Sequence, residues 1–255
     1  MINKQEFENF LKNKNYAALR DFKVDNAIIM AAGLSSRFQP LSTIKPKGLA
    51  KIKGEVLVER QIKQLQDAGI DDIYLIVGYK KEMFYYLKDK YHIHIIENDS
   101  YNTRNNTGSL ILVKDILKNS YICSVDNYFT ENVFEQYNYQ SYYSSIHING
   151  KTDEWCLKTD EHKIINDVVI GGQDADIMLG HVYFNQDFSK KFVDILMRRF
   201  DEEAVKNNVW EALYMQHLDE LKLELKSYND GVILEFDSIE EAKQYDPDFE
   251  KNNPY

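Results

Sequence analysis

The strongest constraint on the fold is a regular alternation of apolar and amphipathic segments between residues 27 and 128. Residues 56–69 repeat apolar side chains at helical spacing and end at Gly69, a residue suited to a helix C-cap. Apolar runs typical of buried strands occupy residues 27–32, 72–79, 93–98 and 120–128, and helical patterns occupy residues 56–69, 81–91 and 107–119. Such alternation predicts an α/β fold: a Rossmann-like, doubly wound, mostly parallel sheet with helices on both faces.

The flanking regions predict the domain organisation. Residues 4–20 have an amphipathic pattern, so residues 1–24 are expected to form an N-terminal helical extension. We assign residues 25–245 to one domain and residues 246–255 to a C-terminal tail. After about residue 140 the pattern changes to short, tyrosine-rich strands and then a helix over residues 187–204. This second half is expected to be a small β-rich insertion or lid on the same sheet.

Composition excludes several classes of function. The chain has 41 acidic against 31 basic residues and a net charge of -10, which disfavours nonspecific binding to nucleic acids. No run reaches the roughly eighteen apolar residues of a membrane span, and the N-terminus lacks the apolar core of a signal peptide. We therefore expect a cytoplasmic protein without membrane insertion.

The stretch "IIMAAGLSSRFQPLSTIKPKGLAKI", residues 28–52, has the composition of a phosphate-binding loop. Ligands of parallel sheets bind beyond the carboxyl ends of the strands, which is where this stretch begins. Gly33 follows two alanines, so a ligand can approach the backbone closely. Arg37 offers a planar fork for phosphate oxygens, and Lys47 a point charge. Alone, the same residues would also fit an ordinary surface loop.

Their order narrows the interpretation. The stretch resembles the signature of the nucleotidyltransferase (pyrophosphorylase) superfamily, in which a strand leads into AAG-x-G-[ST]-R and later P-K. Ser35 stands where many members have a second glycine. Within the superfamily the chain is most similar to bacterial CTP:phosphocholine cytidylyltransferases. That likeness extends over roughly residues 26–245, through "ERQIKQLQDAGIDDIYLIVGYKKE", "YNTRNNTGSLILVK", "SVDNYF", "DEWCL" and "LEFDSIEEA".

The resemblance implies a set of nucleotide and metal positions. Asp126 ends a buried strand, where a carboxylate can either hold Mg²⁺ or start a turn. Asp237 is expected as the second Mg²⁺ ligand, although capping of the next helix is the alternative. The nucleotide is expected to contact the loop residues Ala31, Ala32, Gly33, Leu34, Ser35 and Ser36. The edge of its base is expected to contact Gly78, Tyr79, Asn106, Thr107 and Ser109.

The resemblance implies a second site, which binds phosphocholine as the acceptor of the nucleotide. The chemistry of choline indicates which residues could form it. A quaternary ammonium cannot donate a hydrogen bond, so proteins hold it with aromatic faces and nearby carboxylates. The resemblance places Trp155 and Glu211 in this site. For any one of the aromatic residues, ordinary core packing is the alternative. The full set of expected acceptor residues is Trp155, Tyr183, Trp210, Glu211, Tyr214 and Glu235.

Together with these residues, the resemblance implies Mg²⁺-dependent transfer of CMP from CTP to phosphocholine, giving CDP-choline and pyrophosphate. Lys47 is expected to bridge the α-phosphate and the incoming phosphate, and Arg37 to contact the leaving pyrophosphate. Two alternatives stay open: another acceptor, such as phosphoethanolamine, aminoethylphosphonate or a sugar 1-phosphate, and a regulatory nucleotide-binding protein that has lost catalysis. The N-terminal helix could pack on the domain or mediate contacts in a homodimer.

Overall fold

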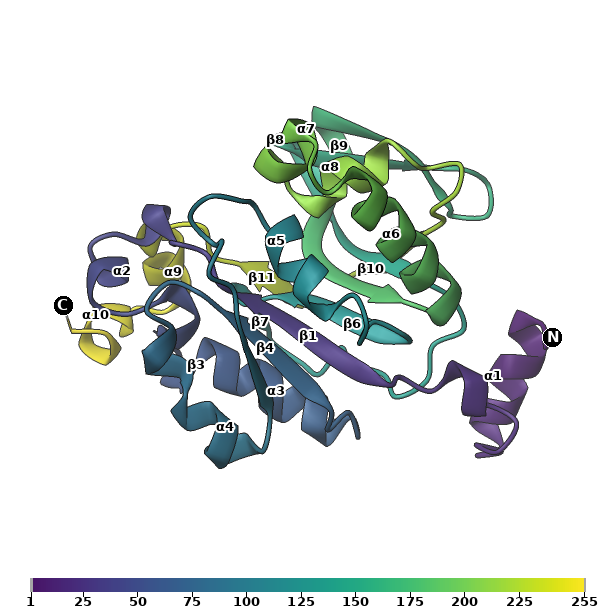
Figure 1. Cartoon of the computed structure of the whole chain (residues 1–255), viewed down its shortest axis with the longest axis horizontal. Helices are drawn as coiled ribbons and strands as arrows, with labels where there is room; N and C mark the ends of the chain where they lie inside the picture. Colours follow the sequence, from purple (N-terminus) through teal and green to yellow (C-terminus); the bar gives the residue numbers. More distant parts are fainter. Residues whose placement is uncertain (1, 255) are drawn as a thin grey trace.

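The computed structural model describes residues 2–254 and has a mixed seven-stranded sheet at its centre (Figure 1). The order of its strands is β10-β8-β9-β6-β1-β4-β5, and β9 alone runs against the others. These strands are β1 (Asn26–Ala31), β4 (Ile73–Val77), β5 (His94–Glu97), β6 (Ser120–Ser124), β8 (Tyr142–Thr159), β9 (Ile165–Phe184) and β10 (Glu224–Tyr228). The predicted α/β class with a mostly parallel sheet is confirmed.

Two short antiparallel pairs and ten α-helices complete the described chain. The pairs join β2 (Lys51–Ile52) to β3 (Glu55–Val56) and β7 (Asn127–Phe129) to β11 (Ile233–Glu235). The helices are α1 (Lys4–Lys12), α2 (Leu41–Ile44), α3 (Leu57–Asp67), α4 (Tyr86–Tyr91), α5 (Thr107–Leu110), α6 (Gln186–Arg199), α7 (Glu203–Asn207), α8 (Trp210–Met215), α9 (Ile239–Tyr245) and α10 (Phe249–Asn252). Single turns of 3₁₀-helix are η1 (Arg20–Phe22), η2 (Ser36–Phe38), η3 (Lys47–Leu49), η4 (Lys81–Phe84) and η5 (Ile111–Val113).

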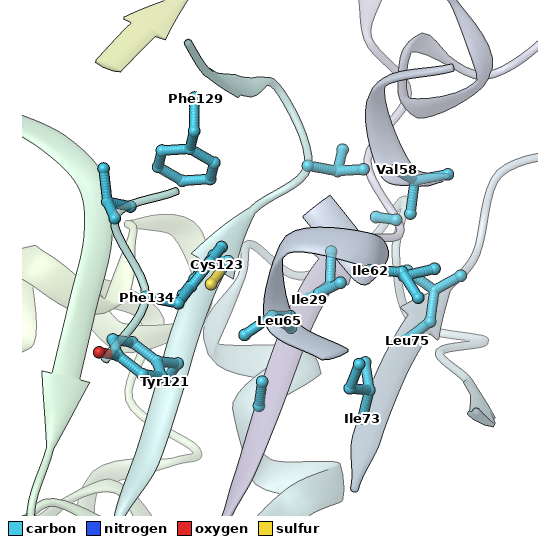
Figure 2. Close-up of a cluster of buried hydrophobic side chains, with 14 of the residues drawn as sticks. Ile29, Val58, Ile62, Leu65, Ile73, Leu75, Tyr121, Cys123, Phe129 and Phe134 are labelled. Carbon is cyan, nitrogen blue, oxygen red and sulfur yellow. The ribbon is translucent and has the colours of Figure 1, made fainter. Parts of the chain in front are cut away.

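The two faces of the sheet are covered by different helices (Figure 1). Alternate residues of β1 point to opposite faces, so Ile29 packs with Val58 and Ile62 of α3, whereas Ile28 belongs to the cluster under α6 and α8. Figure 2 shows the first of these clusters, with the apolar stripe of α3 lying against β1 and β4. Leu65 continues that stripe one turn later, as the helical spacing predicted.

Several predicted elements are shorter than expected. The run over residues 120–128 is two strands, because the chain turns at Val125 and Asp126 between β6 and β7. The run over residues 107–119 is helical only through α5 and η5. Thr107 does not cap this helix; its hydroxyl donates to the carbonyl of Val205 at 2.9 Å.

The expectation of short strands after residue 140 is wrong. β8 and β9 are 18 and 20 residues long and form one hairpin that folds back on itself. Cys156 lies opposite both Val169 and Ile177, and Leu225 of β10 donates its N–H to the carbonyl of Lys163 at 2.8 Å, near the tip of the hairpin. The folded hairpin packs its inner apolar side chains with α6 and α8, in the same cluster that contains Ile28 of β1. It therefore provides the β-rich second half as a curled extension of the central sheet.

Both ends of the described chain pack on the domain. Phe7 of α1 lies 5.3 Å from the Phe22 ring and 5.6 Å from the Tyr139 ring, measured between centroids. Residues 246–255 were expected as a tail, but Phe249 and Asn253 are buried. The Asn253 side chain exchanges hydrogen bonds with the backbone of Lys51, both at 2.8 Å. Across residues 2–254, no helix has the length and apolar character needed to cross a membrane.

Candidate active site

A pocket of about 390 Å³ lies at the carboxyl edge of the parallel strands. Its walls come from the segments that follow β1, β5 and β6, and from the start of the segment after β11. The residues that line it are Met30, Ala31, Ala32, Gly33, Ser35, Ser36, Arg37, Phe38, Pro46, Lys47, Gly48, Asn98, Tyr101, Arg104, Asn105, Asn106, Ser109, Ser124, Val125, Asp126 and Asp237. This is the edge at which ligands of open α/β sheets bind.

The floor of the pocket is backbone without large side chains. A Cβ on Gly33 would meet no heavy atom of the described chain within 4 Å, so the space above this residue is open. Ser35 has a left-handed conformation with φ of 51°, which turns the loop into η2 and presents Arg37 to the pocket. Gly78 has the opposite surroundings, because a Cβ there would lie 2.7 Å from the Cβ of Tyr101. Gly78 thus lets the Tyr101 loop close against the end of β4.

Two cations and two carboxylates form an ion-pair network across the pocket. The Lys47 Nζ lies 3.0 Å from Asp126 Oδ2 and 3.8 Å from Asp237 Oδ1. Arg37 donates to Asp237 Oδ2 at 2.8 Å. The Lys47 side chain is only 6% exposed, whereas that of Arg37 is 73% exposed. Lys47 is therefore fixed in the wall, and Arg37 can move with a ligand.

The carboxylates of Asp126, Glu235 and Asp237 fit a divalent cation. One oxygen atom of each lies within 4.8 Å of the others, and Asp126 Oδ1 is buried without a hydrogen-bond partner among the described residues. Carboxylate oxygens are the ligands that Mg²⁺ prefers. Asp237 does not cap α9; Ser238 does, with its side chain accepting from the Glu241 N–H.

The charges of this cluster shift the pKa values of its own carboxyl groups. Burial opposes ionisation of Asp126, but the charge and hydrogen bond of Lys47, together with hydrogen bonds from Ser124 and the backbone, outweigh burial and hold the pKa of Asp126 below its ordinary value. Burial and the charges of Asp126 and Asp237 raise the pKa of Glu235 to about 8. More than a third of the Glu235 residue surface is exposed, so we give the neighbouring charges the larger weight. A cation at this point would reverse the shift.

The structure brings most of the expected phosphate, nucleotide and metal residues into this one pocket. Those that line it are Ala31, Ala32, Gly33, Ser35, Ser36, Arg37, Lys47, Asn106, Ser109, Asp126 and Asp237. The remaining expected nucleotide residues lie outside the lining that the described residues form. Leu34 projects outward and is 48% exposed, the Tyr79 hydroxyl donates to the Ser42 carbonyl at 3.0 Å, and Gly78 and Thr107 pack behind the wall.

The expected acceptor residues are not gathered around an open cage. Tyr183, Trp210 and Tyr214 are at most 1% exposed and belong to the apolar core, which was the alternative interpretation of these residues. Trp155 is half-buried on β8. Glu211 is 9% exposed, accepts from the Tyr143 hydroxyl at 3.2 Å through Oε1, and has no hydrogen-bond partner at Oε2 within residues 2–254.

Several pocket residues were missed from the sequence. Asn98 ends the third predicted strand, a position that could have marked it, and its amide donates to the Ser109 hydroxyl at 3.1 Å. Tyr101, Arg104 and Asn105 follow in the connecting loop. Their place on the wall depends on how this loop packs on residues far along the chain, since Arg104 donates to the carbonyl of Phe200 at 2.7 Å.

The parallel sheet and a cation-lined, carboxylate-bearing pocket at its carboxyl edge define a nucleotide-binding enzyme. The family model described as MobA-like NTP transferase domain matches residues 27–133. A choline-phosphate cytidylyltransferase from Streptococcus pneumoniae is 32% identical, covering 89% of this chain and 99% of that protein. A 2-aminoethylphosphonate cytidylyltransferase from Lancefieldella rimae is also 32% identical, covering 87% of this chain and 92% of the relative.

A solved structure gives the same result. CTP:phosphocholine cytidylyltransferase from Streptococcus pneumoniae superposes with a TM-score of 0.83 at 33% identity, covering 87% of this chain and 97% of that one. The chain belongs to the cytidylyltransferase family of nucleotidyltransferases that includes these proteins. The recognition of this superfamily from the opening loop is confirmed.

Proposed function

We propose that the protein transfers CMP from CTP to phosphocholine in a Mg²⁺-dependent reaction that releases pyrophosphate and gives CDP-choline. The observation that carries this proposal is the convergence of Arg37, Lys47, Asp126 and Asp237 on one pocket floored by Gly33. The retained network argues against a regulatory protein that has lost catalysis, because such a protein would not need a buried lysine between two acids.

The residues of the pocket can act by alignment and charge stabilisation. The phosphate of the acceptor is ionised at neutral pH, so the reaction needs no strong general base. Lys47 is held rigidly and would contact the α-phosphate and the incoming phosphate as charge develops there. Arg37 is exposed and would move from Asp237 to the leaving pyrophosphate.

The acidic cluster would hold the metal. Asp126 and Asp237, with Glu235 beside them, would bind Mg²⁺, which when present neutralises phosphate charge and orients the phosphates. Arg37 would then be released from Asp237 toward the nucleotide, while Lys47 would keep its place in the wall.

An acidic wall of Glu154, Glu211 and Glu235 lies next to this cluster and would ionise opposite a bound cation, which supports a cationic acceptor. Glu154 acts electrostatically on Glu235, and Glu211 and Glu235 act on Tyr143, whose hydroxyl donates to Glu211 Oε1 at 3.2 Å. Glu154 directly precedes Trp155 on β8. A carboxylate cluster beside one half-buried indole suits a quaternary ammonium.

A second acceptor is favoured by one feature of the same wall. Glu211 Oε2 is buried and lacks a hydrogen-bond partner among residues 2–254, and a primary ammonium could donate to it whereas choline could not. 2-Aminoethylphosphonate carries such an ammonium.

The test is pyrophosphate release with CTP and Mg²⁺, comparing phosphocholine, 2-aminoethylphosphonate, phosphoethanolamine and glucose 1-phosphate. We expect the highest kcat/KM with phosphocholine. A preference for an aminoethyl acceptor would replace the proposed substrate and keep the nucleotide chemistry. Binding of CTP without turnover of any acceptor would instead favour the regulatory function.

A further inference from the structure

The loop from Arg104 to Thr107 connects the nucleotide pocket to the helices of the second half. Arg104 and Asn105 line the pocket. The N–H of Asn105 donates to the carbonyl of Lys206 at 2.9 Å, next to the bond between Thr107 and Val205. The loop is thus tied by backbone and side chain to the segment that leads into α8.

Asn106 is the loop residue that holds α8 itself. It lines the pocket, and its Oδ1 accepts the N–H of Trp210, the first residue of α8, at 2.6 Å. The first N–H groups of a helix have no partner inside the helix, and Val209, the residue before α8, provides no side-chain cap. Asn106 therefore caps α8 from a segment more than 100 residues earlier in the chain.

The position of α8 sets the position of Glu211, its second residue. Burial raises the pKa of Glu211 to about 7, and the Tyr143 hydroxyl donates to Glu211 Oε1 at 3.2 Å. Tyr143 in turn accepts the N–H of Gly180 at 3.1 Å. One end of Glu211 is held by the sheet, and the helix that carries it is held by Asn106.

We propose that Asn106 is a positioning residue that couples the two substrate subsites, rather than a reader of the base edge. Its side chain holds α8 so that Glu211 faces the acceptor, and nucleotide contact with its loop thereby strengthens acceptor binding. This inference rests on the proposed function, in which Glu211 contacts the acceptor. Coupling of this kind is reciprocal in binding free energy.

The test compares Asn106→Ala with Asn106→Asp. Aspartate keeps the oxygen that accepts the Trp210 N–H, and aspartate and asparagine cap helices about equally well. We expect Asn106→Ala to raise the KM of the acceptor about fivefold, the effect of losing one capping bond, with the KM of CTP changed less than twofold. Asn106→Asp should restore the acceptor KM to within about twofold of wild type.

Binding measurements separate coupling from a general loss of structure. Titration calorimetry would measure the affinity for phosphocholine with and without α,β-methylene-CTP and Mg²⁺. The nucleotide analogue should tighten acceptor binding in the wild type and in Asn106→Asp but not in Asn106→Ala. Asn208→Ala is the matched control, since the Asn208 amide contacts the Ala204 carbonyl and not α8.

The outcomes distinguish this inference from the proposed function. A raised KM for CTP with an unchanged acceptor KM in Asn106→Ala would show a base reader and overturn the inference. Failure of Asn106→Asp to restore acceptor binding, with a melting temperature no higher than that of Asn106→Ala, would overturn the capping role. A wild type that uses another acceptor would overturn only the proposed substrate, and the same variants would then be compared with that acceptor.

Discussion

At the scale of single residues, Lys47 is the group on which the charges of the pocket converge. It lies within 3.0 Å of one metal-site carboxylate and 3.8 Å of another, and its ammonium stands 5.1 Å from the centre of the Phe38 ring. Such a fixed charge needs no reorganisation when negative charge develops on the phosphates. Its contribution is therefore expected in the transition state more than in nucleotide binding.

The corresponding prediction concerns Lys47→Ala. We expect kcat to fall by about 100-fold or more, with the affinity for CTP changed by no more than about threefold. Single-turnover kinetics and equilibrium binding of CTP would measure the two effects separately. Lys51→Ala, at an exposed position on β2, is the matched control. A Lys47→Ala enzyme that keeps near-wild-type turnover would contradict the assigned role.

Two glycines of the pocket should respond oppositely to alanine. At Gly33 a Cβ meets open space, whereas at Gly78 it would lie 2.7 Å from Tyr101 and 2.8 Å from the carbonyl oxygen of Ala32. We expect Gly33→Ala to keep the melting temperature within about 2 °C and to weaken CTP binding at least tenfold, because the methyl group occupies ligand space. Gly78→Ala should instead lower the melting temperature, by about 4 °C or more.

Thermal melts and CTP titrations on both variants decide the matter. Equal losses of stability in the two variants would mean that the loop after β1 is not open to a ligand as the structure indicates.

At the scale of secondary-structure elements, the N-terminal helix α1 is expected to add stability without contacting the active-site pocket. α1 precedes β1 and lies at the amino edge of the sheet (Figure 1). The pocket lies at the carboxyl edge. Phe7 is the buried residue of α1, and Asn3 and Glu6 form a capping box at the start of the helix. The helix is therefore a docked element with its own start signal.

We predict that Phe7→Ala lowers the free energy of unfolding by about 3 kcal/mol, the usual effect of removing a buried phenylalanine. Values of kcat and KM should remain at wild-type levels because the pocket is built from other elements. Urea unfolding followed by circular dichroism gives the stability, and Leu11→Ala, on an exposed part of α1, serves as the control. A changed KM for CTP in Phe7→Ala would place α1 in contact with the active site after all.

Elements that are specified by local sequence could be predicted, whereas elements that depend on distant pairings could not. The stripe of Val58, Ile62 and Leu65 recurs at helical spacing and specifies α3 locally, and pocket residues directly after strands, such as Gly33 and Asp126, follow from the topology of parallel sheets. The path of β8 and β9 could not be predicted in this way. Their fold-back depends on pairings of Cys156 with both Val169 and Ile177, which no local pattern encodes.

The roles of the aromatic residues could not be predicted from local sequence either. Trp155 and Trp210 both stand beside a glutamate in the sequence, yet Trp155 is half-buried and Trp210 is 1% exposed. An aromatic side chain fits a core as well as a cation site, so only the packing of α8 against the hairpin separates the two. The place of Arg104 in the pocket was not predicted for a related reason, because its hydrogen-bond partner Phe200 lies 96 residues away in the sequence.

At the scale of the whole molecule, the acids around the pocket make stability depend on pH. Burial raises the pKa of Glu211 to about 7, and burial together with the charges of Asp126 and Asp237 raises the pKa of Glu235 to about 8, with the charges having the larger weight at that exposed position. In the unfolded chain both are ionised above their ordinary pKa of about 4.5. The folded protein therefore binds more protons than the unfolded chain between about pH 5 and 8, and its stability falls as pH rises through that range.

Buried His181 sets the lower limit of the pH range in which the two glutamates determine the change in stability. Burial lowers the pKa of His181 to about 3, so the stability that depends on neutral His181 is lost only as pH falls below its ordinary value of about 6.5. Between pH 6.5 and 8.5 the two glutamates should dominate. We predict that the melting temperature of the protein in EDTA decreases across this window, and that Glu211→Gln removes the part of the decrease centred near pH 7.

Melting curves at pH 6.5, 7.5 and 8.5 test this, with Glu240→Gln at an exposed position of α9 as the control. A melting temperature that stays constant or rises in the wild type would mean that Glu211 and Glu235 are both already ionised at pH 6.5. Glu211 would then need a cationic partner inside the protein, and its free oxygen would no longer be available to an acceptor. The pH dependence of stability thus bears on the same carboxyl group as the choice of substrate, by a measurement that requires no turnover.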